Sequence, residues 1–265
     1  MYNKYWGLKE PPFENVPDPR FLYHSTQHDE ALMRMTYAVK NRKGAAMLTG
    51  EIGCGKTLLS RSFMQQLAGG PYEIGVVANP NFPPLDFLKE VIYQFGIRRN
   101  AESKSDLLHV LNESMLDNMR NGKDTIIIVD EAQVINHQDT YEELRLLLNF
   151  QMNERFLLTL ILIGQPDLRD RITAIPQFEQ RIAIKYHLGP LKLNDVAKYL
   201  MFRLKTAGMQ KNVFTKEAII KIYEYTQGVP RRINNICDLA LLVGFSSKAN
   251  IIDSKLIQKL IEDRG

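Results

Sequence analysis

The chain has 265 residues, of which 45% are hydrophobic and 24% are charged, and its formal net charge is +4. This length suits more than one ordinary domain, and the composition is that of a globular protein rather than a fibrous or disordered one. The small basic excess does not indicate an obligate nucleic-acid binder. The two cysteines, Cys54 and Cys237, suit reduced thiols rather than a disulfide framework.

Targeting and metal signals are weak in this sequence. Residues 1–10 mix lysines and a glutamate with aromatic residues and lack the apolar core of a signal peptide. The longest apolar stretch, 156–164, is much shorter than the roughly 20 residues that a helix needs to cross a bilayer. His24 and His28 could share a helix face, but no third metal ligand accompanies them. We therefore expect a cytoplasmic protein with no zinc site.

In chain order, residues 1–24 form an arm rich in proline and aromatic residues, and residues 26–43 have helical spacing. Apolar runs that predict strands then alternate with helical patterns, which predicts a parallel sheet with helices on both faces. The strands are expected at 45–49, 73–79, 125–129, 157–163 and 181–188, and the helices at 57–67, 84–96, 103–121 and 139–152. After residue 190 only helices are expected, at 194–207, 215–226, 230–245 and 253–262.

A phosphate-binding motif lies between the first expected strand and the helix after it. Residues 50–57 fit the pattern G-x-x-x-x-G-K-[ST], whose glycines let backbone N–H groups turn toward phosphate oxygens. Lys56 is placed for the β- and γ-phosphates of ATP, and the Thr57 hydroxyl for Mg²⁺. The expected ATP-binding loop comprises Gly50, Glu51, Ile52, Gly53, Cys54, Gly55, Lys56 and Thr57. If Cys54 faces the phosphates, maleimide should label it only without nucleotide.

Polar residues follow two later strands. The strand at 125–129 runs into two carboxylates, of which Asp130 is expected to hold Mg²⁺ through water and Glu131 to orient and deprotonate the attacking water. The alternative interpretation of Asp130 and Glu131 is an acidic cap of the loop with no role in catalysis. Gln165 follows the next strand, and ligands of parallel sheets lie at the carboxyl ends of strands. We expect Gln165 to touch the γ-phosphate or the attacking water, unless it is an ordinary turn residue.

Three further residues are candidates for the same site. Asn79 ends the second expected strand, where it could hydrogen-bond Glu131 and hold it away from the water; the sequence is equally that of an ordinary turn. Arg181 begins the last strand and would reach the nucleotide of a neighbouring subunit, whereas Arg231 would reach that of its own chain. Guanidinium groups suit the charge of a phosphoryl-transfer transition state, although solvated arginines are the alternative.

Seven blocks in this order resemble the AAA+ module of the general secretion pathway protein A family, over residues 1 to about 262. They are Tyr5–Phe13, Pro17–Tyr23, Gly50–Thr57, Asp130–Gln133, Gly164–Leu168, Gln180–Ile182 and Gly228–Asn234. The change from alternating strands and helices to helices alone places a domain boundary near residue 190. The resemblance implies that residues 1–190, including the arm, form an α/β P-loop NTPase (AAA+) domain and that residues 191–265 form a smaller all-helical lid domain. By the same resemblance, Asp130 and Glu131 are the Walker B pair, Gln165 is sensor 1, Arg181 the arginine finger and Arg231 sensor 2.

The resemblance also implies a function and partners. It implies that Mg-ATP is bound at subunit interfaces of an oligomer, such as a ring, and hydrolysed slowly without that oligomer or a partner. Hydrolysis would be coupled to assembly or regulation of a secretion or pilus machine, through an envelope protein at the cytoplasmic face of the inner membrane. Many members continue into a membrane span and a periplasmic domain. These residues contain neither, so a fragment and a stand-alone protein both remain open.

The alternative is an ATP-dependent DNA-binding regulator of transposition, because ATPases of transposition systems are among the family's relatives. The basic residues that could contact duplex DNA are Lys40, Arg42, Lys43, Arg98 and Arg99. Solvated helix ends are the simpler interpretation of these residues. Phosphate contacts would make any DNA binding steeply salt-dependent, which separates the two functions.

Overall fold

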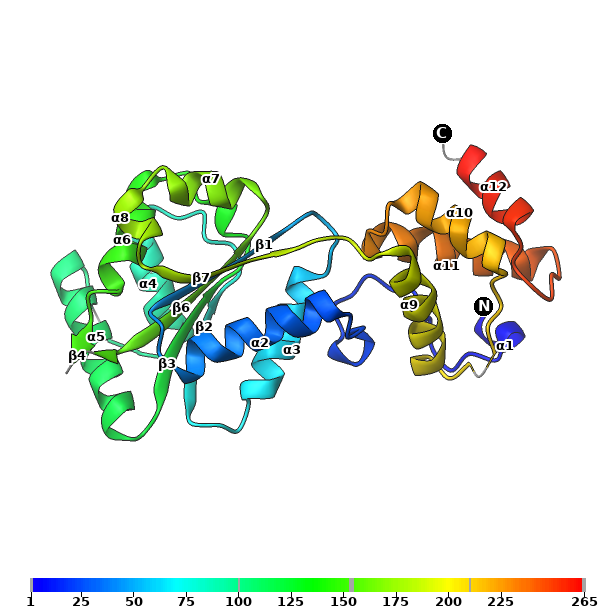
Figure 1. Ribbon diagram of the computed structural model, residues 1–265. Helices are drawn as coiled ribbons and strands as arrows, with labels where there is room; N and C mark the ends of the chain where they lie inside the picture. Colours follow the sequence, from blue (N-terminus) through cyan, green and yellow to red (C-terminus); the bar gives the residue numbers. More distant parts are fainter. Residues whose placement is uncertain (1, 100, 153–154, 210, 264–265) are drawn as a thin grey trace. The chain divides into compact units, whose positions relative to one another are not determined.

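The computed structural model describes residues 2–99, 101–152, 155–209 and 211–263. The chain divides into two compact units (Figure 1). The sheet unit contains Asp29–Glu51 and Ser62–Leu188, and the helical unit contains Met1–His28, Ile52–Arg61 and Gly189–Gly265. No helix within the described ranges is long and apolar enough to cross a membrane.

The sheet unit is built on a parallel sheet with the strand order β2-β3-β6-β1-β7. Its strands are β1 (Ala45–Gly50), β2 (Tyr72–Val77), β3 (Asp124–Val129), β6 (Leu158–Gly164) and β7 (Ile182–Leu188). Thr49 pairs with Gly164, and Val129 pairs with Leu162. Because all the strands are parallel, the carboxyl ends of β1, β3 and β6 lie side by side at one end of the strands, which we call the carboxyl edge of the sheet.

Helices cover both faces of this sheet (Figure 1). They are α2 (Thr26–Lys40), α3 (Lys56–Leu67), α4 (Pro84–Gln94), α5 (Lys104–Arg120), α6 (Gln138–Leu147), α7 (Asp167–Thr173) and α8 (Pro176–Glu179). Every residue of β1 and β6 is buried, whereas β2 and β7, the two outermost strands, are partly exposed. Burial on both faces explains the continuous apolar sequence of the central strands. The predicted fold class is confirmed.

The sheet unit departs from the sequence prediction between residues 139 and 181. The helix expected over 139–152 ends at Leu147, and a short antiparallel pair follows, β4 (Gln151–Met152) with β5 (Arg155–Phe156). The N–H of Leu157 donates to the carbonyl of Phe150 at 2.9 Å, which adds one hydrogen bond to this pairing, so these residues bond to each other rather than continue the helix. Helices α7 and α8 lie in a stretch that the sequence left unassigned.

The helical unit contains α9 (Leu193–Thr206), α10 (Lys216–Thr226), α11 (Pro230–Ser246) and α12 (Ser254–Glu262), near the predicted boundaries. The arm, with α1 (Asn3–Trp6) and η1 (Pro19–Phe21), belongs to this unit, although the sequence placed it with the α/β domain. The physical reason is that Trp6, Phe13 and Phe21 bury their rings in the helices' apolar core. Arg203 fixes the arm further, since its Nε donates to the Pro12 carbonyl at 2.6 Å.

Candidate functional site

The carboxyl edge of the sheet gathers three of the sequence-predicted positions. β1 ends at Gly50, β3 ends just before Asp130, and β6 ends just before Gln165. Gly50 is required sterically, because a Cβ there would lie 2.5 Å from the carbonyl oxygen of Leu188 on β7. The acidic turn after β3 and the motif that begins at the end of β1 therefore start at the same end of the sheet, with β6 between the two strands.

The acidic turn after β3 has a defined geometry. The N–H of Asp130 continues the sheet pattern by donating to the Val77 carbonyl at 2.9 Å. Oδ1 of Asp130 accepts the N–H of Glu131 at 2.9 Å. Glu131 has φ +52°, a left-handed conformation that non-glycine residues rarely adopt. This conformation ends the strand's alternation, so the two adjacent side chains need not point to opposite faces of the sheet.

Gln133 contacts the predicted base, and sequence reasoning gave it no role. Its Nε2 donates to Oε2 of Glu131 at 2.6 Å, and its Oε1 accepts the N–H of Gln165 at 3.0 Å. The side chain is buried, at 5% exposure. The only sequence signal was its membership of the Asp130–Gln133 block in the family resemblance.

Asn79 does not occupy the position expected from the sequence. β2 ends at Val77 rather than at Asn79, whose side chain is exposed. Among the described residues, the side chain bonded to the Glu131 carboxylate is Gln133 and not Asn79. The expected hydrogen bond between Asn79 and Glu131 is therefore absent, because the chain leaves the sheet two residues before Asn79.

Two glycines of the expected phosphate-binding loop have positive φ angles. Gly53 has φ +84° and Gly55 has φ +98°, values that favour glycine. α3 begins at Lys56, carries no acidic residue in its first turn and buries the Lys56 side chain. A helix N-terminus whose first turn carries a lysine and no acidic residue fits the phosphates of ATP. Thr57 and Asp130 offer the oxygen donors that Mg²⁺ prefers.

Within the helical unit, the start of α11 contacts this loop. The N–H of Arg231 donates to the Gly53 carbonyl at 3.1 Å, and a Cβ on Gly53 would lie only 2.8 Å from the Cβ of Arg231. The backbone of Arg231 thus contacts this loop, while the contact of its guanidinium with the nucleotide stays a prediction. Nε2 of His28 lies 3.3 Å from the Cys54 carbonyl, so the loop is also held from α2.

The thiol of Cys54 is fully buried, at 0% exposure. A buried thiol reacts slowly with maleimide whether or not nucleotide is bound, so nucleotide-gated labelling is no longer expected. Cys237 is also buried, which raises the pKa of its thiol, and neither cysteine forms a disulfide. Cys54 therefore contributes its backbone to the loop rather than an exposed side chain.

Arg181 lies one residue before β7 rather than within it. Its guanidinium donates to the Leu148 carbonyl at 3.4 Å and to Oδ1 of Asn149 at 3.1 Å. The start of β7 is at the amino ends of the strands, whereas Asp130 and Gln165 are at the carboxyl ends. Seven strand residues separate the two ends, which is roughly 20 Å at about 3.3 Å per residue.

The AAA domain family profile matches residues 39–172. The chain belongs to the AAA domain family. General secretion pathway protein A of Aeromonas hydrophila is 39% identical over 249 residues, which cover 93% of this chain and 45% of that protein. An HTH-type transcriptional regulator of Methanocaldococcus jannaschii is 27% identical over 60% of this chain and 39% of its own.

The relative from Aeromonas confirms the resemblance that the seven sequence blocks indicated. This AAA chain spans less than half the length of either curated relative. Solved structures share its fold. The ORC2 protein of Aeropyrum pernix has a TM-score of 0.71 at 19% identity, over 96% of this chain and 71% of its own. The CDC6 protein of Pyrobaculum aerophilum has a TM-score of 0.70 at 14% identity, over 91% and 67% respectively.

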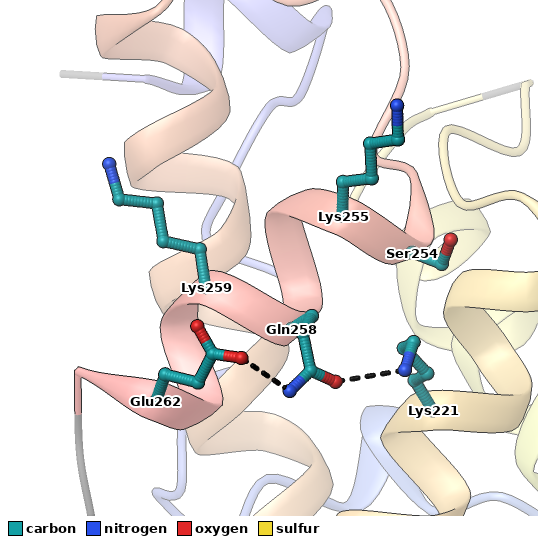
Figure 2. A pocket seen from close by; sticks show the side chains of 6 residues that line it. All are labelled: Lys221, Ser254, Lys255, Gln258, Lys259 and Glu262. Carbon is teal, nitrogen blue, oxygen red and sulfur yellow. Dashed lines mark hydrogen bonds between the residues drawn. The ribbon is translucent and has the colours of Figure 1, made fainter.

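A separate pocket of this AAA protein lies on α10 and α12 (Figure 2). Lys221 donates to Oε1 of Gln258 at 2.8 Å, and Nε2 of Gln258 donates to Glu262 at 2.7 Å. Ser254, Lys255 and Lys259 complete the lining, and the pocket contains none of the residues expected at the nucleotide site.

Proposed function

We propose that this AAA protein binds Mg-ATP and hydrolyses it. The observation that supports this most directly is the hydrogen-bonded turn at the end of β3, which holds the Glu131 carboxylate beside Gln165 at the carboxyl edge of the sheet. A fixed carboxylate at the end of β3, the strand that pairs with β6, is suited to take a proton from an attacking water.

The other residues divide the remaining work. Lys56 and the amides of the loop bind and orient the phosphates, while Thr57 and Asp130 would hold Mg²⁺, which neutralises phosphate charge when bound. Gln165 would contact the γ-phosphate, and Arg231 would contact the nucleotide from the helical unit, which we propose acts as a lid domain. Asn79 would contact Glu131 only if its exposed side chain reorients. Arg181 would act as the arginine finger for the nucleotide of a neighbouring subunit.

We infer the wider process from similarity. General secretion pathway protein A of Aeromonas hydrophila is a relative over 93% of this chain, so we propose that hydrolysis assists assembly or regulation of an envelope machine for secretion or pili. The partners would be further copies of this chain and an envelope protein, at the cytoplasmic side of the inner membrane. Because turnover would depend on these partners, the isolated chain would hydrolyse ATP slowly.

No contact observed in the described residues favours the transposition alternative. Arg42 pairs with Asp124 at 2.7 Å, Arg99 pairs with Glu113, and Lys43 lies over the ring of Tyr37. The two ion pairs offset part of the positive charge that duplex DNA would require. A labelled duplex whose binding falls steeply with salt would restore that alternative.

Two substitutions test the proposed ATPase activity. Lys56→Ala should remove most affinity for ATP, because it deletes the buried cation at the phosphates. Glu131→Gln should bind ATP normally and hydrolyse it at least about 10²-fold more slowly, the usual effect of losing a general base. Calorimetry measures the affinity, and phosphate release measures turnover. Undiminished ATP binding by Lys56→Ala, or wild-type turnover by Glu131→Gln, would contradict the assignment.

A further inference from the structure

The amide of Gln133 joins two residues that are distant in sequence. It belongs to η2 (Ala132–Val134), immediately after the acidic turn, and it is bonded to both Glu131 and the backbone of Gln165. The backbone N–H of Gln165 can only donate, so the amide atom facing it must be oxygen. The NH₂ group consequently faces Glu131, and the orientation of the amide is fixed by its partners.

The end of β6 is shaped to admit this amide. A Cβ on Gly164 would lie 2.8 Å from Oε1 of Gln133 and 2.7 Å from Cδ2 of Leu168. Any larger residue at 164 would therefore displace Gln133 or the buried Leu168. A glycine at the last position of β6 is needed for the amide to reach the backbone of Gln165.

We propose that Gln133 is a positioning residue that ties the Glu131 carboxylate to the end of β6. It occupies Oε2 of Glu131 and so orients the carboxylate, whose Oε1 remains to accept a proton from water. Gln165 is the residue proposed to contact the γ-phosphate. If its backbone moves, the amide of Gln133 moves with it and changes the position of the Glu131 carboxylate. A hydrogen bond to a carboxylate is stronger than one between neutral groups, which suits it to this task. The inference rests on the proposed ATPase activity.

The first test compares Gln133→Met with Gln138→Met, the same change at an exposed position on α6. Methionine keeps the length and removes both hydrogen bonds. Because hydrogen bonds to charged groups are strong, kcat for ATP should fall about 10- to 100-fold in Gln133→Met. The dissociation constant for ATP, measured by calorimetry, should stay within about threefold, since Gln133 acts through Glu131 rather than on the nucleotide. Gln138→Met should match the wild type in both.

A second variant gives a signature that a purely structural role would not produce. Gln133→Glu keeps the acceptor for Gln165 but places a carboxylate against Glu131. Two adjacent carboxylates share a proton at lower pH, and the protonated carboxyl of the variant can then donate to Glu131 as the amide does. The kcat of Gln133→Glu relative to wild type should therefore rise as the pH is lowered. This ratio also decides the question if Gln133→Met fails to fold.

The outcomes separate the two proposals. If Glu131→Gln is inactive but Gln133→Met turns over like Gln138→Met, the role of Gln133 is overturned while the ATPase activity stands. A rise in the ATP dissociation constant with unchanged kcat, or a pH-independent ratio for Gln133→Glu, would also overturn it. A wild-type protein that shows no hydrolysis, even when concentrated, would overturn both.

Discussion

At the scale of single residues, Tyr141 on α6 supports the turn that carries Glu131. Its hydroxyl donates to the Ala132 carbonyl at 2.8 Å, and the ring is buried. Tyr141→Phe removes this bond together with the hydroxyl's interaction with Arg171 and keeps the ring, so the free energy of unfolding should fall by about 1 kcal/mol. Urea denaturation measures the change. The matched control is Tyr93→Phe on an exposed part of α4, which should stay within about 0.5 kcal/mol of wild type.

The same hydroxyl predicts a pH dependence. Burial raises the pKa of Tyr141 from 10.0 to about 12, although Arg171 partly lowers it. The folded state therefore keeps the proton at a pH where the unfolded state has lost it, and deprotonation favours unfolding. The stability advantage of wild type over Tyr141→Phe should be complete below about pH 10 and should shrink as the pH rises toward about 12. A constant difference across this range would show that the hydroxyl is not enclosed.

At the scale of elements, the contact between the phosphate loop and α11 depends on Gly53. A side chain there would combine a strained φ of +84° with a Cβ only 2.8 Å from that of Arg231. Gly69 has a similar φ of +79° but nothing within 4 Å of a Cβ. Both alanine substitutions should cost about 1–2 kcal/mol in backbone strain. Only Gly53→Ala should also weaken ATP binding, by at least about tenfold in calorimetry, because α11 must move. Equal affinities for the two variants would mean that the contact does not matter for binding.

The elements also show what the sequence can specify. β1, β3 and β6 were predicted within a residue or two because both faces of each strand are buried, which leaves a continuous apolar run. The β4–β5 pair was missed because strands of two residues have no periodicity. Gln133 was missed for a different reason. Its bond to Gln165 spans 32 positions and depends on β3 and β6 pairing, which no local pattern records.

At the scale of the whole molecule, the arm illustrates the same limit. Its proline and aromatic content predicted an irregular segment that packs by its side chains, but not the surface that it packs against. The structure shows that Arg203 holds the carbonyls of Pro12 and Glu14 at 2.6 and 2.7 Å and lies 4.6 Å from the ring of Phe21. Such long-range contacts arise only once α9 is in place, so composition alone could not assign the arm to the helical unit.

Arg181 gives the prediction that concerns assembly. It precedes β7, at the edge of the sheet opposite Asp130, which favours action on the nucleotide of a neighbouring subunit over action on its own. Cationic fingers of this kind contribute roughly 10³–10⁵ to turnover in phosphoryl transfer. Turnover per chain should therefore rise with protein concentration, as mass action fills the oligomer. Arg181→Ala should bind ATP normally and lose hydrolysis. Asn149→Ala, which removes a partner of Arg181 but keeps the charge, should remain active.

Mixing inactive variants tests whether the finger is shared between subunits. Arg181→Ala has an intact Glu131, and Glu131→Gln has an intact Arg181. If Arg181 acts across an interface, a mixture contains some interfaces that combine an intact base with an intact finger, so part of the activity should return. Size-exclusion chromatography with a labelled variant establishes that the two chains assemble together. A mixture that assembles but stays inactive, together with a wild-type rate per chain that does not depend on concentration, would place Arg181 within its own subunit or outside the reaction.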